Sequence, residues 1–272
     1  MQDDVTPPPP PPPAADRRTG AVGEGGHAAG KEICRCFDQY RIRRPRVVRF
    51  HAQRQDTTSA AWHRLLEAVE EAAADGREEF RPLAGLSPEE QRQIITLPPT
   101  IAKLTEVRHL MLYGSNLVRI PPEIGAMTGL QRFTPYTSNR LHWFPYELIR
   151  CPRLKSGTVS IRSLYGNAKI RPPFPPLQPG RTSTRDLDLG DLDPEVWGAE
   201  SIRACSVCDR PIAAAGLHQV WISLRVGADV LPFLVNACSP DCVAALPAPA
   251  EGYVPTPHTG GPGIVQPRAD YA

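Results

Sequence analysis

A short motif that begins with an apolar residue and a proline occurs three times in the middle of the chain. Its copies start at Leu97, Ile120 and Phe144, so the second follows the first by 23 residues and the third follows the second by 24. Four residues after each start stands an isoleucine or a leucine, as with Ile101 in the first copy. A period of this length predicts supersecondary units that bury their apolar faces by stacking on one another.

Alternating apolar residues lead into the second and third copies of the motif. Val107, Leu110 and Leu112 precede the second copy, and Leu130 and Phe133 precede the third. Side chains at alternate positions lie on one face of a strand, so this pattern predicts one strand with a buried face in each unit. The prolines of the motif then begin the opposite side of each unit, where no ladder N–H is required.

The spacing and the strand pattern together resemble the leucine-rich repeat family, in its short bacterial form with Leu/Ile-Pro-x-x-Ile units. The resemblance covers roughly a quarter of the chain. It implies an α/β fold in which the units form a short solenoid with an open, concave sheet face. Two positions depart from the pattern: Pro135 stands where a central strand needs an N–H, and Gly157 replaces an inward-facing leucine. We therefore expect an irregular array that needs its flanking segments for stability.

Two further positions in the repeats have predicted roles. Asn116 and Asn139 follow the strands, and we expect their side-chain amides to bond backbone groups of neighbouring units. Cys151 lies on the side opposite the strands in the third unit, where a free cysteine is interpreted as a small core hydrophobe.

The stretch before the repeats predicts a helical cap. Trp62, Leu65 and Val69 form an apolar stripe at helical spacing over residues 58–75, and Gly76 follows where a left-handed residue ends a helix. Residues 87–90, Ser-Pro-Glu-Glu, have the sequence of a capping box. We expect the helix that follows to run to residue 97 and to cover the open end of the first unit, because an uncovered first unit would expose its apolar interior.

The strand positions that do not face the core define the predicted partner-binding surface. This surface combines arginine, tyrosine and methionine, a mixture that protein interfaces favour. It consists of Arg108, His109, Met111, Tyr113, Gln131, Arg132, Thr134, Tyr136, Lys155 and Thr158. His109 and His142 are too far from other candidate ligands in the sequence to predict a metal site.

Four cysteines near the C-terminus form a second constellation. Cys205 and Cys208 are separated by two residues, and Cys238 and Cys242 follow them after an interval of thirty. Two such pairs match the ligand spacing of a tetrahedral zinc site. Apolar runs at 220–226 and 230–235 predict a β-hairpin between the pairs, and Ser239 followed by proline predicts a helix start that places Cys242 on its first turn.

A turn pair, a hairpin and a pair at a helix start resemble a treble-clef zinc finger of the TRASH/MYM type. The segment 237–242, Ala-Cys-Ser-Pro-Asp-Cys, is similar to the Phe-Cys-Ser-x-x-Cys ending of those fingers, although Ala237 stands where they have an aromatic residue. Four cysteines fill the zinc shell and leave no position for substrate, so the expected Zn²⁺ is structural. Unliganded buried thiols are the alternative interpretation, and His218 is a further ligand candidate that the four cysteines make unnecessary.

Composition limits the possible functions. A net charge of +2 implies no strong global field. Seven cysteines, an odd number with two close pairs, fit a metal site in a reducing compartment better than a disulfide framework. The sequence contains no apolar run of about 18 residues and no signal peptide at its start, so we expect a cytoplasmic protein without a membrane span.

Residues 31–54 are locally basic and contain two cysteines, Cys34 and Cys36, with one residue between them. This composition supports an alternative function, a nucleic-acid-binding regulatory protein that uses the basic segment and the zinc module. Free thiols are the simplest interpretation of the two cysteines.

The predicted organisation has six parts. They are a disordered Pro/Gly-rich tail at 1–30, a basic segment and helical cap at 31–86, leucine-rich repeats at 87–170, a linker at 171–196, a zinc module at 197–255 and a disordered tail at 256–272. The sequence lacks the signatures of serine hydrolases, metalloproteases, phosphate loops and dinucleotide folds. We therefore expect a non-enzymatic scaffold for protein–protein interaction.

Overall fold

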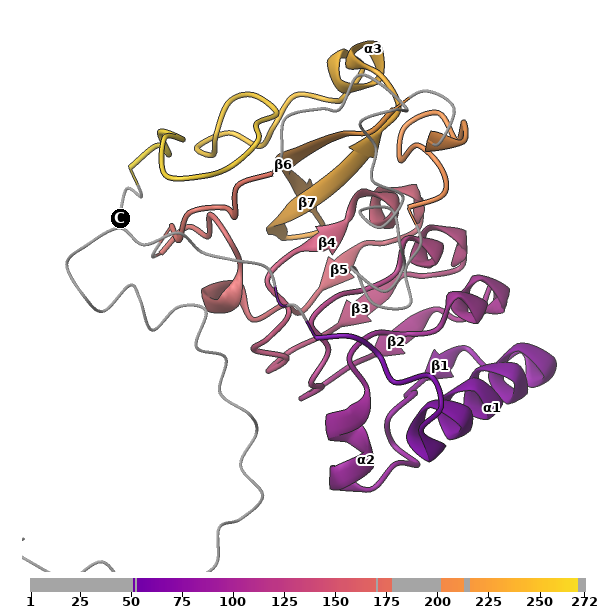
Figure 1. The fold of residues 1–272 in the computed structure, drawn as a ribbon. Helices are drawn as coiled ribbons and strands as arrows, with labels where there is room; N and C mark the ends of the chain where they lie inside the picture. The colour runs from indigo at the N-terminus through magenta and orange to yellow at the C-terminus, as the bar shows by residue number, and fades with distance from the viewer. Residues whose placement is uncertain (1–50, 52, 170, 178–201, 213–215, 269–272) are drawn as a thin grey trace, which may run out of the picture. The chain divides into compact units, whose positions relative to one another are not determined.

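The computed structural model describes residue 51 and residues 53–169, 171–177, 202–212 and 216–268 (Figure 1). These residues form an α/β structure with two sheets, three α-helices and several short 3₁₀ helices, labelled η. In chain order the elements are α1 (Ala60–Asp75), β1 (Glu79–Phe80), α2 (Pro88–Gln93), η2 (Pro99–Lys103), β2 (His109–Met111), η3 (Pro122–Ala126), β3 (Arg132–Thr134), β4 (Phe144–Pro145), η4 (Tyr146–Arg150), β5 (Ser156–Gly157), η5 (Ile161–Ser163), β6 (His218–Val226), β7 (Asp229–Ala237) and α3 (Pro240–Ala244).

The repeat of the sequence is also a repeat in space. β1, β2, β3 and β5 form a parallel sheet in that order, and Figure 1 shows them one above the next. Leu110 pairs with Phe133, 23 residues later, and Phe133 pairs with Gly157, 24 residues later. Leu110 and Phe133 are almost fully buried, so equivalent side chains of successive units stack in one core.

Short 3₁₀ helices form the other side of the units. η2, η3 and η4 each follow a proline of the motif and lie side by side. Ile101, Ile124 and Leu148 point from them into the core and are at most 1% exposed. The proline before each helix has an extended backbone, which ends the preceding segment and starts the helix without a need for its missing N–H.

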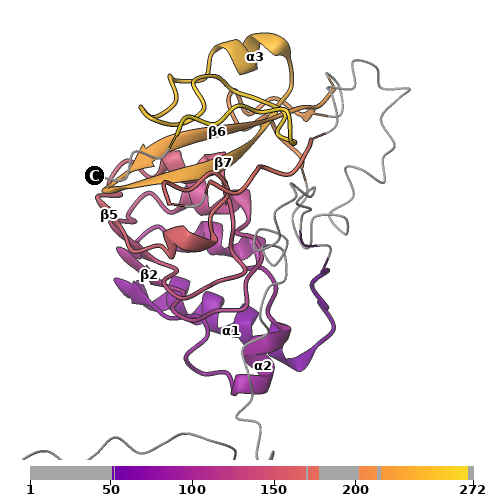
Figure 2. The same ribbon diagram turned by 90° about the vertical axis from the view of Figure 1, so that its left-hand side faces the viewer.

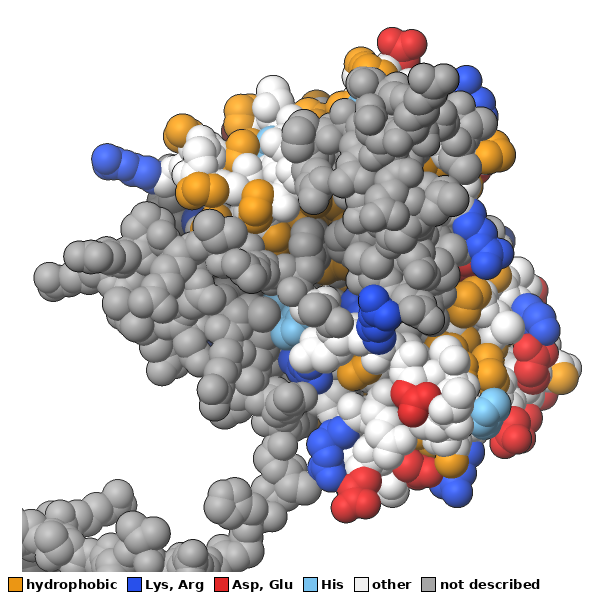
Figure 3. Space-filling model, in the orientation of Figure 1, with side chains coloured by type: hydrophobic (Ala, Val, Ile, Leu, Met, Phe, Trp, Pro, Cys, Tyr) orange, Lys and Arg blue, Asp and Glu red, His pale blue; other side chains and the backbone are white. Residues whose placement is uncertain are grey.

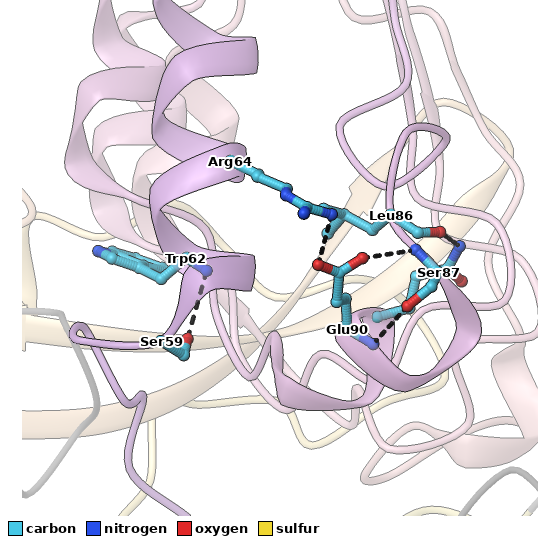
Figure 4. A network of polar contacts seen from close by, with 7 residues as sticks. Ser59, Trp62, Arg64, Leu86, Ser87 and Glu90 are labelled. Atoms are coloured by element: carbon cyan, nitrogen blue, oxygen red, sulfur yellow. Dashed lines mark hydrogen bonds and ion pairs between the residues drawn. The ribbon is translucent and has the colours of Figure 1, made fainter.

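The two helices of the cap, α1 and α2, begin at the capping residues that the sequence predicts. Ser59 accepts a hydrogen bond from the backbone of Trp62, and Gly76 ends α1 in the left-handed conformation. The Ser87 and Glu90 side chains bond each other's backbone N–H groups, which makes a complete capping box (Figure 4). Around this end of the molecule acidic and basic side chains are interspersed, as Figure 3 shows.

The second cap helix is shorter than predicted, because α2 ends at Gln93 and does not continue to Leu97. Ile94 already has an extended backbone, and the N–H of Ile95 donates to Oε1 of Gln55 at 2.7 Å. A residue before proline avoids the helical region, so Leu97 could not have continued the helix in any case.

Serines connect the units where asparagines were predicted to do so. The hydroxyls of Ser115 and Ser138 lie 2.7 Å apart, and Ser138 also donates to the carbonyl of Leu112 at 2.8 Å. Asn139 is exposed, so the prediction for it is wrong. A serine hydroxyl is short enough to bond the adjacent unit from inside the turn, one position before the asparagine.

The hairpin of β6 and β7 completes a second sheet with the third repeat unit. β7 pairs with β6 on one side and with β4 on the other, where Phe144 lies opposite Phe233. One continuous hydrophobic cluster contains residues of the cap, the repeats and the hairpin. The hairpin therefore covers an apolar face of the last unit.

The segment after residue 255, predicted to be a disordered tail, contacts the hairpin at His258. The backbones of Trp221 and His258 bond each other in both directions, at 2.7 and 3.1 Å. Phe174, Trp221 and Val254 belong to a second buried cluster on the other side of the hairpin. Within 256–268, His258 thus holds the chain against the outer edge of β6, and residues 269–272 lie outside the described part of the chain.

Several predictions concern residues outside the described part of the chain. These are the tail at 1–30, the basic segment up to residue 50 with Cys34 and Cys36, and most of the linker at 171–196. Within the described residues no helix is both long and apolar enough to cross a membrane.

Candidate metal centre

The first cysteine pair lies on a tight turn. The backbone N–H of Cys205 donates to the carbonyl of Arg210 at 2.8 Å, and the N–H of Asp209 donates to the carbonyl of Cys205 at 3.0 Å. Asp209 adopts a φ of 61°, a left-handed conformation that Asp tolerates better than most residues. The reversal directs both thiols of the pair to the same side.

The second cysteine pair lies at the start of α3. β7 ends at Ala237, and Ser239 caps the helix by accepting a hydrogen bond from the N–H of Cys242 at 3.2 Å. Cys242 is therefore on the first turn, as the sequence predicts.

The tight two-residue turn between β6 and β7 uses Gly227, whose φ is 60°. A Cβ at this position would lie 2.7 Å from the carbonyl oxygen of Lys155.

The four sulfur atoms converge, as the sequence predicts. All four ligand atoms lie within 4.8 Å of one another. Three of the sulfur pairs are closer still: Cys208 to Cys238 at 3.5 Å, Cys238 to Cys242 at 3.7 Å, and Cys242 to Cys208 at 3.6 Å. A zinc–sulfur bond of about 2.3 Å gives a tetrahedron whose edges are about 3.8 Å, whereas a disulfide needs about 2.05 Å. The geometry fits four ligands of one metal ion and not a disulfide.

Neighbouring groups shift the pKa values of Cys208 and Cys238 in opposite directions. Arg210 donates from Nε to the sulfur of Cys208 at 3.2 Å and lowers the pKa of Cys208 to about 6. Loss of solvation and the other sulfurs raise the pKa of Cys238 to about 12. Cys205 accepts hydrogen bonds from the N–H groups of Val207 and Cys238, each at 3.4 Å. Four thiolates so close together require a cation, and a metal ion would supply one.

The centre is tied directly to the third repeat unit. Arg150, at the end of η4, donates to the carbonyl of Ser206 at 2.7 Å and forms an ion pair with Asp209 at 2.7 Å. Both acceptors belong to the cysteine turn. Because all four ligands come from the protein, the centre has no position for a substrate and is suited to a structural role.

The residues of the predicted partner-binding surface lie in or next to the strands β2, β3 and β5, and all but one of them are exposed or half-buried. Tyr113 and Tyr136 are strongly exposed, and Arg132 and Lys155 are exposed as well. His109 is the exception: only 8% of its surface is accessible, because it bonds Thr134 at 2.9 Å and lies against Glu79. The remaining members of the predicted surface are exposed or half-buried: Arg108, Met111, Gln131, Thr134 and Thr158.

The sequence prediction missed two glutamates beside the metal centre, of which Glu147 is buried and Glu123 is half-buried. Glu123 and Glu147 occupy equivalent positions of two successive motifs, and both line a cavity of about 300 Å³ together with Cys205 and Asp209. Burial raises the pKa of both carboxyl groups. One carboxyl oxygen of each has no hydrogen-bond partner among the described residues. The sequence did contain a signal for this pair, because glutamate stands at the fourth position of both the second and the third copy of the motif.

Glutamine in place of Glu147 is expected to stabilise the protein at neutral pH. Folding raises the pKa of the Glu147 carboxyl group. Such a group contributes its full stability only at a pH below its pKa in the unfolded chain, and this contribution is lost as the pH rises through its pKa in the folded protein. Each pKa unit corresponds to about 1.4 kcal/mol, so we expect a gain on the order of 1 kcal/mol at pH 7 that disappears toward pH 4. Denaturant unfolding of E147Q across this pH range measures it.

The matched control for this prediction is Glu67, an exposed residue of α1. E67Q, a change on the exposed surface, should leave the free energy of unfolding at pH 7 unchanged within about 0.5 kcal/mol. If E147Q were less stable than the unchanged protein at pH 7, the buried carboxylate would be contributing net stability through Ser206 and Arg150, and the prediction would fail.

The comparisons with known proteins found no relative. No protein-family model matches the chain, and no curated protein or solved structure is significantly similar to it.

Proposed function

We propose that this protein is a non-enzymatic scaffold of the leucine-rich repeat type that binds another protein on its exposed sheet face. In this proposal the parallel sheet is the concave side of a short solenoid, and α1 and α2 cover its first unit. The hairpin and a structural Zn²⁺ bound by the four cysteines close the other end. The in-register stacking of units 23 and 24 residues apart supports the solenoid assignment.

A pair of tyrosines carries the proposal of protein binding. Tyr113 is 63% exposed and Tyr136 is 45% exposed, and their ring centres lie 6.0 Å apart. Each follows the end of its strand at the same position, so the two rings form one row on the sheet. Large aromatic side chains that remain exposed in neighbouring positions are typical of the centre of a protein interface.

Charged groups around the tyrosines favour an acidic partner. Arg132 and Lys155 are exposed, and neither forms an ion pair within the described residues. Arg108 belongs to the same edge but is paired with Glu78 at 3.0 Å. A partner that brings carboxylates to Arg132 and Lys155 would gain charge-assisted hydrogen bonds at the rim of the aromatic pair.

The nucleic-acid alternative has less support. The basic segment on which it depends lies largely outside the described residues. In the described part of the zinc module the cations are few, and one of them, Arg210, is bonded to Cys208. Retention on a polyanion at about 0.1 M salt, with a steep loss at higher salt, would favour the alternative.

Loss of the aromatic pair tests the proposal. The substitutions Y113A, R132A and Y136A, combined in one chain, should weaken binding of a partner isolated by affinity capture by at least about tenfold, because hot-spot residues each contribute about 2 kcal/mol. The measurement is the Kd for the purified partner, together with the Tm of the triple variant. Surface substitutions away from the core change stability little, so the Tm should stay within a few degrees.

The matched control changes exposed residues on the opposite side of the units, with I149A and R153A in one chain. This control should bind the partner as the unchanged protein does. Equal binding by the sheet-face variant and the unchanged protein would disprove the role of the sheet face.

A further inference from the structure

The cavity beside the metal centre lies between the repeat units and the cysteine turn. Its walls come from η3 and η4 on one side, and from the cysteine turn and Asn236 of β7 on the other. Figure 2 shows the hairpin and α3 across the end of the repeat stack, where these parts meet. Its volume of about 300 Å³ is at the lower end of the range for small-molecule sites, so it would hold one small ligand or one side chain.

Two glutamates in the walls of the cavity each keep an unsatisfied carboxyl oxygen. Only 7% of the surface of Glu147 is accessible, and its Oε2 has no hydrogen-bond partner among the described residues. Oε2 of the half-buried Glu123 has none there either. Buried carboxylates are normally paired with a cation or satisfied by hydrogen bonds, so each exception requires an explanation. A cationic ligand in the cavity would provide the missing donors.

The cavity also contains two arginines, and in the described structure neither forms an ion pair with the glutamates. Arg150 is held by Asp209 and by the carbonyl of Ser206, each at 2.7 Å. Arg203 is exposed, and its charge attracts Glu123 without an ion pair between them. Together the walls carry three carboxyl groups and two guanidinium groups. One further positive charge would therefore balance the site.

Apolar side chains complete the walls of the cavity. Pro122, Ala126 and Ala204 line it beside the acidic groups, and Ile202 adds a longer aliphatic side chain. Walls of this kind suit the alkyl stem of a long cationic group. The two carboxyl groups suit a planar guanidinium, because its fork of N–H groups can donate to more than one carboxylate.

We propose that this cavity binds an alkylguanidinium cation, which Glu147 and Glu123 hold by charge-assisted hydrogen bonds. The cation can be a free small molecule or the arginine side chain of another protein, because both present the same group to the cavity. The site does not involve the strands that carry the proposed partner-binding surface, so the two proposals can fail separately.

Calorimetric titration of the full chain with butylguanidine tests the proposal. Butylurea has nearly the same shape but no charge, and it should bind far more weakly. E147Q and E123Q keep the size of the side chain and remove its charge, so each should raise the Kd for butylguanidine by at least about tenfold. R203A should lower the Kd, because it removes a competing cation. The Tm of each variant verifies that it is folded.

Two control variants should bind butylguanidine as the unchanged protein does. One is E67Q on the exposed surface of α1, and the other combines Y113A, R132A and Y136A on the strands. A short peptide with blocked ends and a single arginine distinguishes the two sources of the cation. If it binds more tightly than butylguanidine, the site takes an arginine of another protein, and if it does not, the site takes a free cation.

Three results would overturn the proposal. The first is that neither butylguanidine nor the arginine peptide binds. The second is that butylurea binds as tightly as butylguanidine, since the charge would then be irrelevant. The third is that E147Q and E123Q both leave the Kd for butylguanidine unchanged, because the cation would then lie elsewhere on the protein.

Discussion

Replacement of Cys242 by serine is expected to empty the four-cysteine centre and to lower the free energy of unfolding by several kcal/mol. Cys242 lies within 3.7 Å of two other sulfurs, so its loss breaks the tetrahedron and leaves crowded thiols without a cation. Structural zinc contributes about 10–16 kcal/mol to small zinc-binding peptides, whereas whole domains are stable by only about 5–15 kcal/mol. This substitution should therefore have the largest effect of any single change in the chain.

Metal analysis and thermal unfolding measure this expectation together. C242S should bind one zinc ion fewer than the unchanged protein and should unfold at a much lower temperature. C151A is the control, because Cys151 is a buried cysteine that bonds a backbone carbonyl and belongs to no metal site. An unaltered Tm in C242S would show that the centre contributes nothing to the fold.

Truncation of Phe144 to alanine is expected to cost about 3–5 kcal/mol, the usual loss for a buried aromatic residue. Phe144 is fully buried and meets the ring of Phe133 edge to face at 5.8 Å. In β4 it also lies opposite Phe233 of the hairpin. The substitution therefore removes contacts in the repeat units and in the β6–β7 hairpin at once, and both should unfold in a single transition at a lower denaturant concentration.

Tyr113 provides the comparison for this second expectation, because its ring is 63% exposed. Y113A should change the free energy of unfolding by no more than about 0.5 kcal/mol. A biphasic transition in F144A, with one part unchanged, would show that the repeats and the hairpin do not share a core.

Short-range signals in the sequence predicted much of the architecture. The 23- and 24-residue steps predicted which residues stack, because strands in register repeat the spacing of the motif. The capping box at Ser87 and the left-handed end of α1 at Gly76 depend on residues close in sequence. The spacing of Cys238 and Cys242 at a helix start belongs to the same kind of signal.

Contacts between distant segments could not be predicted in this way. Nothing near Phe144 or Phe233 indicates that β4 and β7 pair across almost ninety residues. The pairing of Trp221 with His258 likewise depends on a segment whose composition alone suggests a loose tail. Glu123 and Glu147 were missed for a different reason: acidic residues in a repeat are expected to face solvent, whereas Glu123 is half-buried and Glu147 is buried.

The central claim is that the β6–β7 hairpin, with its metal centre, covers the last repeat unit and shares a hydrophobic core with it. Measuring hydrogen exchange with and without a chelator tests this claim most directly. Removal of the metal should increase amide exchange in β6 and β7 and also in β3 and β4 of the adjoining units, while α1 at the far end changes least. Increased exchange confined to residues 202–246, with the amides of β3 and β4 as protected as before, would contradict the account.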